Sequence, residues 1–92
     1  MKEIWSDEAW DDYVYWQNQD KKTLKKINRL LQDISRNGYN SIGKPEPLSG
    51  NLAGFWSVRI DAKNRIVFRI NRDALEIAQC GSSHCDSHYR DK

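Results

Sequence analysis

The sequence predicts an α+β domain of order β-α-α-β-β-β, with two helices packed on a twisted antiparallel sheet. Two observations predict this class. Apolar residues recur at helical spacing between residues 9 and 34, and from residue 55 onward their period changes to two. The chain has 92 residues, of which 38% are hydrophobic and 30% charged, a balance typical of one globular domain with a single modest core. We therefore expect residues 1–92 to form one domain.

The first half of the chain predicts a short strand followed by two helices. Residues 2–5 predict the strand, and Ser6 is a suitable N-cap for a helix over about residues 7–18. Asp20 can cap a second helix, which Gly38 ends. The apolar side chains of this second helix form one stripe: Leu24, Ile27, Leu30, Leu31 and Ile34.

The second half predicts an antiparallel meander of three strands over residues 55–60, 65–70 and 75–80, joined by turns rich in Asp and Asn. Alternation assigns one face of each strand to the core beneath the helices. Cys80 falls on the opposite face. The residues expected to face the helices are Trp56, Val58, Ile60, Ile66, Phe68, Ile70, Leu75 and Ile77.

Matching these apolar faces predicts the register of the first hairpin. Ile60 is expected to pair with Ile66, which leaves a three-residue loop and places Asn64 in the left-handed position of that loop. Arg59 then lies opposite Val67, on the face away from the helices.

The same matching predicts the second hairpin. Ile70 is expected to pair with Leu75, which places Cys80 opposite Arg65. The segment that follows Cys80 then departs beside Arg59 and Arg65, and it contains the only two histidines of the sequence. We therefore expect a basic sheet face with a histidine-bearing tail at one corner.

The net charge of +2 hides a strong asymmetry along the chain. Residues 1–20 carry one lysine and six acidic residues, a net charge of −5, whereas residues 21–36 carry six basic residues and one aspartate, a net charge of +5. A basic stripe is usually a solvated face, but it is also typical of nucleic-acid binding. On the second helix it lies opposite the apolar stripe, available to a partner: Lys21, Lys22, Lys25, Lys26 and Arg29.

The sequence also predicts the compartment. No apolar run is long enough to span a membrane, and no signal peptide opens the sequence, so we expect a cytoplasmic protein. In that compartment Cys80 and Cys85 are expected to be free thiols rather than a disulfide.

The stretch GKPEPL contains the only two prolines of the chain, Pro45 and Pro47. Each proline fixes its own φ and makes the preceding residue extended, so Glu46 lies on a stiff, non-helical backbone. On its own the stretch favours a strand entry. The alternative is a carboxylate positioned as an acid or a base, because catalytic side chains must be pre-organised.

Glu46, the two arginines and the histidine-bearing tail together suggest metal-free RNA cleavage as one hypothesis. A carboxylate can take the proton of a ribose 2′-OH, which then attacks the adjacent phosphorus, and a histidine can return a proton to the departing 5′ oxygen. Arginines neutralise the charge that grows on the phosphate oxygens. The alternative is a basic sheet face that only binds a partner.

These residues also carry a family resemblance. The opening IWSDEAWDDYVYWQNQDKKTLKKIN, then GKPEPL, NLAGFWSVRI and NRIVF, resemble the YoeB/Txe branch of the RelE superfamily over nearly all of residues 1–80, and a His-Tyr pair follows. The resemblance implies a microbial-ribonuclease-like fold and a toxin of a type II toxin–antitoxin pair. Such toxins cleave mRNA in the ribosomal A site, stop translation, use no metal or other cofactor, and are silenced by a YefM/Axe-type antitoxin.

The resemblance also implies partners and a role for each site residue. The expected partners are the ribosome, mRNA and the antitoxin, without a membrane, and a homodimer is compatible with them. Lys44 and the basic face of the second helix are expected to contact RNA or the ribosome. The implied catalytic residues are the general base Glu46, the phosphate-binding Arg59 and Arg65, the general acid His88 and the adjacent Tyr89.

Two substitutions depart from the family pattern near the expected site. Ser49 stands where a lysine often follows PEPL, so one phosphate contact is in doubt. Val58 stands where a second arginine commonly precedes Arg59. A domain that keeps the fold and only binds antitoxin, ribosome or RNA is therefore the alternative function.

A third departure is the atypical C-terminal tail, residues 81–92. The family's His-Tyr pair usually comes sooner after position 80, and residues 82–86 are interpreted as an insertion. His84 is closer to the usual spacing but is followed by Cys85 rather than tyrosine, so it is the alternative general acid. We expect the inserted residues to loop out and His88 to act.

The tail also raises the question of a zinc site. Four candidate ligands lie close together, but their spacing matches no standard structural zinc site, and adjacent ligands are hard to orient onto one ion. No metal is therefore expected. These residues are Cys80, His84, Cys85 and His88.

Overall fold

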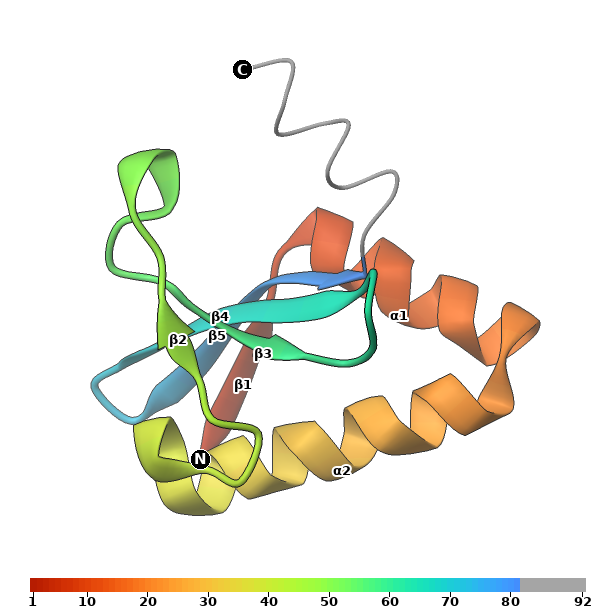
Figure 1. Cartoon of the computed structure of the whole chain (residues 1–92), viewed down its shortest axis with the longest axis horizontal. Helices are drawn as coiled ribbons and strands as arrows, with labels where there is room; N and C mark the ends of the chain where they lie inside the picture. Colours follow the sequence, from red (N-terminus) through yellow and green to blue (C-terminus); the bar gives the residue numbers. More distant parts are fainter. Residues whose placement is uncertain (82–92) are drawn as a thin grey trace.

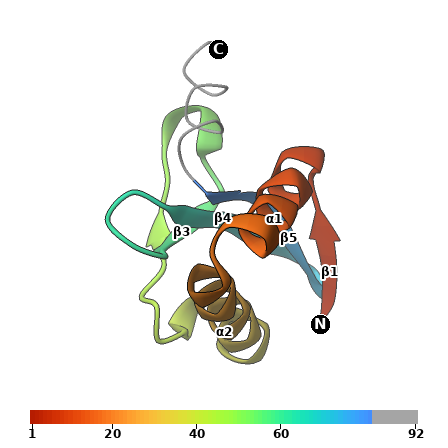
Figure 2. The ribbon, with the colours of Figure 1, turned by 90° about the vertical axis from the view of Figure 1, so that its right-hand side faces the viewer.

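A computed structural model of the chain describes residues 1–81. In that range two helices cover one face of a five-stranded sheet of order β1-β5-β4-β3-β2 (Figures 1 and 2). The predicted α+β class is confirmed. The elements are β1 (Lys2–Trp5), α1 (Asp7–Gln19), α2 (Lys21–Asn37), the 3-10 turn η1 (Gly38–Asn40), β2 (Glu46–Pro47), the 3-10 turn η2 (Gly50–Leu52), β3 (Trp56–Arg59), β4 (Arg65–Asn71) and β5 (Ala74–Gly81).

Two features of the sheet differ from the prediction. β1 runs parallel to β5, with Trp5 beside Ile77, so the sheet is mixed rather than antiparallel throughout. The GKPEPL stretch adds a further edge strand, β2, which pairs antiparallel with β3. Its prolines are tolerated there because an edge strand forms ladder hydrogen bonds on one side only.

Side-chain caps begin both helices, as predicted. The Ser6 hydroxyl accepts a hydrogen bond from the Ala9 amide at 3.0 Å, and the Asp20 carboxylate accepts one from the Thr23 amide at 3.2 Å. The Thr23 hydroxyl also donates to Asp20 at 2.7 Å, and these hydrogen bonds lower the pKa of that carboxyl. Gly38, with a φ of 58°, ends α2 as expected.

The core lies between the helices and the sheet. The apolar stripe of α2 points into it, whereas the basic side chains of that helix are exposed, as predicted. Neither helix within residues 1–81 is long and apolar enough to cross a membrane. The buried apolar residues of the core are Ala9, Ile27, Leu31, Ile34, Val58, Ile60, Ile66, Phe68, Leu75, Ile77 and Cys80.

The register of the β3–β4 hairpin differs from the prediction by two residues because the turn is centred one residue earlier, with the Ile60 amide donating to the carbonyl oxygen of Asn64 at 2.8 Å. The Asp61 carboxylate accepts hydrogen bonds from the amides of Lys63 and Asn64 at 2.8 and 2.9 Å, and its bonds to the Asn64 side chain lower its pKa. With this side-chain turn, Asn64 does not take the predicted left-handed conformation. The observed pairs are Val58–Ile66 and Arg59–Arg65, in place of the predicted Ile60–Ile66 and Arg59–Val67.

The β4–β5 hairpin begins with the predicted pairing of Ile70 with Leu75. One extra residue, Ala78, then forms a bulge in β5. The bulge shifts the remainder of the strand by one residue, and a shift of one residue exchanges the faces to which the side chains point.

Beyond the bulge, Cys80 points into the core and Gln79 faces the open side of the sheet. The predicted position of Cys80 on the open face is therefore wrong. Cys80 pairs with Ile66 and is completely buried, and burial raises the pKa of its thiol to about 12. Gly81, rather than Cys80, lies opposite Arg65.

Ser6 connects this bulge to the start of α1. Its hydroxyl donates a hydrogen bond to the carbonyl oxygen of Ala78 at 3.0 Å while it accepts the one from Ala9. Its own amide donates to the carbonyl oxygen of Ile77 at 3.0 Å. One residue therefore caps the helix and binds the bulged part of β5.

Replacing Ser6 with alanine should destabilise the whole domain. Ser6→Ala removes the helix cap and leaves the Ala78 carbonyl oxygen without this donor, so we expect the free energy of unfolding to fall by about 1–3 kcal/mol. The measurement is urea denaturation followed by tryptophan fluorescence. Ser49→Ala is the control, because Ser49 is exposed and its side chain does not cap η2. Equal effects of the two changes would contradict the role of Ser6.

Candidate active site

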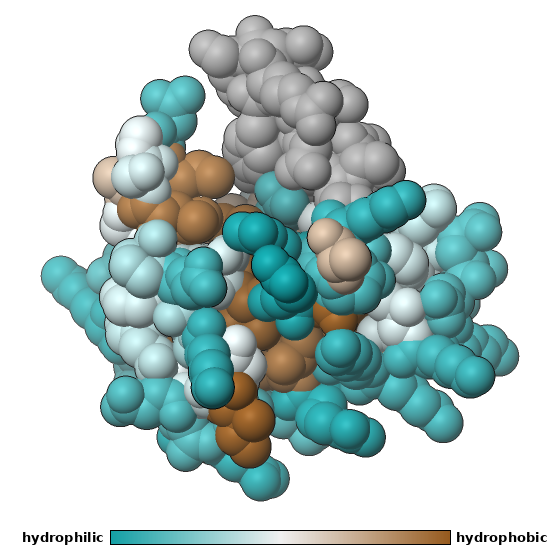
Figure 3. All heavy atoms as spheres, viewed as in Figure 1, coloured by the Kyte–Doolittle hydropathy of each residue, from teal (hydrophilic) through white to brown (hydrophobic). Residues whose placement is uncertain are grey.

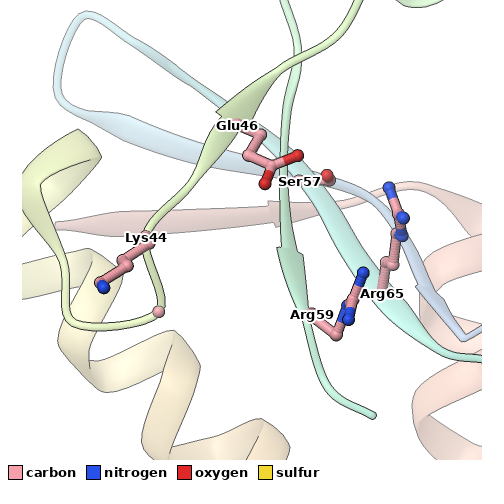
Figure 4. Close-up of a pocket in the computed structure, with 6 residues that line it drawn as sticks. Lys44, Glu46, Ser57, Arg59 and Arg65 are labelled. Atoms are coloured by element: carbon pink, nitrogen blue, oxygen red, sulfur yellow. The ribbon is translucent and has the colours of Figure 1, made fainter. Parts of the chain in front are cut away.

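A cavity of about 210 Å³ opens on the sheet face away from the helices, where β2, β3 and β4 meet. Glu46 enters it from β2, Arg59 from β3 and Arg65 from β4 (Figure 4). These are three of the catalytic residues expected from the sequence, and the fold brings them to one place. The lining residues are Gly43, Lys44, Glu46, Ser57, Arg59 and Arg65.

Glu46 lies directly opposite Ser57 in the β2–β3 ladder. Figure 4 shows its carboxylate directed across β3 toward the Ser57 hydroxyl. Within residues 1–81 the Glu46 side chain is exposed and forms no ion pair or side-chain hydrogen bond. Its oxygens are therefore available to accept a proton from a bound molecule.

The loop before β2 is held in place by both stacking and hydrogen bonds. The Tyr39 ring stacks on Trp56 with 4.5 Å between ring centroids, and its hydroxyl accepts the Ile70 amide at 2.8 Å. Further along, the Asp33 carboxylate accepts the amide of Ile42 at 2.6 Å. The backbone that carries the candidate base is thus fixed from α2 and from the sheet.

Gly43 brings this loop into close contact with β3. A Cβ atom at this position would lie 2.6 Å from Cγ1 of Val58, so a larger residue does not fit without movement. Lys44 follows with a φ of 55°, a conformation that costs a lysine free energy. Its side chain lines the cavity but points away from the arginines (Figure 4).

Arg59 and Arg65 lie directly opposite one another in the β3–β4 ladder. Like charges in directly opposed positions destabilise a sheet. Neither guanidinium forms an ion pair with a carboxylate in the part of the chain that the structure describes. An anion bound between them would remove the repulsion and satisfy the fork of donors that each arginine presents.

The predicted basic face of α2 does not reach this cavity. Its side chains are exposed, and none of them lines the cavity, so α2 offers a second and separate positive surface. These residues are Lys21, Lys22, Lys25, Lys26 and Arg29.

Helix α1 determines where the chain leaves β5. The Asp12 carboxylate, which is fully buried, accepts a hydrogen bond from the Cys80 amide at 3.0 Å. The Trp16 ring nitrogen donates to the carbonyl oxygen of Cys80 at 2.7 Å. The next residue, Gly81, lies opposite Arg65, so the tail begins beside the candidate phosphate site.

The predicted tail residues His84, His88 and Tyr89 lie outside the described residues, as does Cys85. Cys80 is a buried core residue, which argues against its use in the four-ligand zinc alternative. Among residues 1–81 no group of three or more histidine, cysteine or carboxylate side chains could hold a metal ion.

Sequence reasoning missed two residues on this open face. Ser57 lies between the carboxylate and the arginines, and its place two residues before Arg59 in an alternating strand could have revealed it. Gln79 reaches the open face only through the bulge at Ala78, and no signal in the sequence marks that bulge.

The comparisons with known proteins identify the class to which this fold and site belong. A family model described as the YoeB-like toxin of bacterial type II toxin–antitoxin systems matches residues 5–89. The chain belongs to this family.

Individual relatives agree with this assignment. The toxin YoeB of Escherichia coli K12 is 54% identical over 80 residues, which are 87% of this chain and 95% of that protein. A YoeB–YefM complex from Staphylococcus aureus contains a chain that superposes with a TM-score of 0.84 at 42% identity, covering 90% of this chain and 97% of that one. A chain of the YoeB dimer from Staphylococcus aureus superposes with a TM-score of 0.82 at 43% identity, covering 90% of this chain and 97% of that one.

Adding a methyl group at position 43 should disturb the loop that carries Glu46. Gly43→Ala places a Cβ against Val58, and we expect this overpacking to lower the free energy of unfolding by about 1–3 kcal/mol. The measurement is a double-mutant cycle with Val58→Ala, which removes the opposing methyl groups. The double variant should be more stable than the sum of the two single effects implies. Additive effects would show that the two positions do not press on one another.

Proposed function

We propose that this toxin is a ribosome-dependent, metal-independent endoribonuclease that cleaves mRNA in the A site and thereby inhibits translation. One observation carries the proposal: a carboxylate that has no side-chain partner among residues 1–81 and two opposed arginines line one cavity on the open face of the sheet. This arrangement offers a proton acceptor next to a site for a phosphate. Side chains supply the base, the acid and the positive charge, so the reaction needs no metal.

In the proposed mechanism Glu46 removes the proton of a ribose 2′-OH. The resulting oxygen attacks the adjacent phosphorus, and the bond to the 5′ oxygen breaks. The products are a 2′,3′-cyclic phosphate on one fragment and a 5′-hydroxyl on the other. Arg59 and Arg65 stabilise the negative charge that grows on the phosphate oxygens in the transition state, which is when their charge contributes most.

The proposed general acid is His88, with Tyr89 beside it to stack on a base or orient the phosphate. His84 is the alternative acid. The support for either is that the tail begins at Gly81, opposite Arg65, after α1 has fixed both backbone polar groups of Cys80. Gly81, from which the tail starts, therefore lies next to the site that we propose for the phosphate.

The proposal includes partners. We propose that the basic face of α2 and Lys44 contact ribosomal RNA or mRNA, because they are exposed and positively charged. The relative from Staphylococcus aureus has been solved with YefM and as a dimer, which supports a YefM-type antitoxin and a homodimer for this chain as well.

Removing the proton acceptor should abolish cleavage without unfolding the protein. Glu46→Gln keeps the shape of the side chain, and we expect mRNA cleavage to fall by roughly 10²–10⁴-fold, the range for acid–base groups. The measurement is primer extension on mRNA in a translation extract with added protein, with Glu8→Gln on α1 as the matched control. Near-normal cleavage by the Glu46 variant would remove it from the mechanism. If the wild-type protein binds ribosomes without cutting mRNA, the alternative of a pure binding module is correct.

A pair of substitutions distinguishes the two histidines of the tail. We expect His88→Gln to lose mRNA cleavage on ribosomes and His84→Gln to retain it, because only His88 has a neighbouring tyrosine. The reverse pattern would assign the acid to His84. Retention of cleavage in both variants would show that the tail carries no catalytic acid.

A further inference from the structure

A second cavity, of about 390 Å³, lies directly beside the candidate active site on the open face of the sheet. The two cavities share Ser57 and Arg65, so a molecule that binds a phosphate in the first extends naturally into the second. Its walls come from the β2–η2 arm, the β3–β4 loop and the sheet. The lining residues are Leu48, Leu52, Ser57, Ala62, Lys63, Arg65, Val67 and Gln79.

The floor of this second cavity carries a polar group in a fixed orientation. Gln79 is 5% exposed, and its Nε2 donates a hydrogen bond to the carbonyl oxygen of Gly81 at 2.8 Å. Because a carbonyl oxygen can only accept a hydrogen bond, the nitrogen end of the Gln79 side-chain amide must face Gly81, and the oxygen end must point away from it. That end is Oε1, which accepts no hydrogen bond within residues 1–81.

An amide oxygen that accepts no hydrogen bond from the protein needs water or a bound molecule to supply the donor. In a packed core such a position would be filled by an apolar side chain. Here the oxygen is at a cavity, where a bound molecule can supply the missing donor. The Ala78 bulge produces this arrangement, because without the shift of register Gln79 would point into the core.

Apolar side chains form part of the cavity wall. Leu48 and Leu52 line it from the arm that carries β2 and η2, and Figure 3 shows apolar surface over this arm. Val67 lines it from β4. Lys63 adds a positive charge from the β3–β4 loop. Apolar walls, one hydrogen-bond acceptor and adjacent cations match a nucleotide: the base contacts the walls and the phosphates contact the cations.

We propose that the second cavity binds the base of a nucleotide next to the cleaved phosphate, and that Gln79 Oε1 accepts a hydrogen bond from an amino group of that base. The proposal rests on the proposed function, because it places the phosphate of the same RNA between Arg59 and Arg65. Adenine, cytosine and guanine carry an exocyclic amino group, and uracil does not. Gln79 thus makes the toxin discriminate against uracil at the subsite.

The test in cleavage is Gln79→Met, which keeps the length of the side chain but removes both polar atoms. Wild-type and variant proteins are added to a translation extract, and the cut sites are mapped by sequencing the 5′ ends of the fragments. We expect the wild type to disfavour uracil at one position next to the cut and the variant to relax that preference by about 2- to 10-fold, the range for one hydrogen bond. The matched control is Gln17→Met, an exposed position on α1. An unchanged preference in the Gln79 variant overturns the proposal.

A second measurement does not depend on cleavage. The side-chain amide signals of Gln79 in the full-length protein are followed by NMR during titration with the four nucleoside 3′-monophosphates and with inorganic phosphate. We expect the adenosine, cytidine and guanosine nucleotides to shift these signals more than uridine 3′-monophosphate does. The subsite would be overturned if inorganic phosphate shifted the Gln79 signals as much as the nucleotides do. It would also be overturned if no nucleotide shifted them.

The two measurements separate this proposal from the proposed function. A wild-type protein that cuts no mRNA but binds nucleotides through Gln79 would refute the nuclease and leave the subsite. A wild-type protein that cuts mRNA with a base preference that Gln79→Met does not change would support the nuclease and refute the subsite. If Gln79→Met cuts nothing at any site, the NMR titration of the wild type decides the proposal alone.

Discussion

The contact between α1 and β5 is the constraint on which most of this molecule depends. The cap residue and two side chains of the helix bind backbone groups at the end of the strand: Ser6 at the bulge, and Asp12 and Trp16 at Cys80. Side chains of this segment thus bind the Ala78 carbonyl oxygen and both backbone polar groups of Cys80, while Gln79 and Cys80 keep their ladder partners in β4. The irregular part of β5 is therefore a defined structure, and it directs Gln79 to one face and Cys80 to the other.

The candidate site combines two different kinds of rigidity. Glu46 is on a short edge strand, where its neighbouring prolines and the packing of Gly43 leave few alternatives for the backbone. The arginines are on paired strands, where the ladder keeps two like charges opposed. Their repulsion costs stability in the free protein, and an anion bound between them would relieve that cost.

Much of the fold follows from periodicity and capping, whereas register does not. The apolar stripe of α2 and the alternation of β3 and β4 predict the core face because burial requires it. The β3–β4 register depends on whether Asp61 or Asn64 organises the loop, and the Asp61 carboxylate does so by accepting the amides of Lys63 and Asn64. The Ala78 bulge depends on Ser6, which lies 72 positions earlier in the chain, and no local pattern reports such a contact.

The parallel pairing of β1 with β5 also has a consequence during synthesis. The β1 ladder and the hydrogen bonds from Ser6, Asp12 and Trp16 all involve residues 74–80, so these contacts cannot form until that last described strand exists. Contacts of such high sequence separation are formed slowly, because a long loop must close before they contribute. A nascent chain therefore cannot complete its core, which includes Leu75 and Ile77 of β5, until translation has passed that strand.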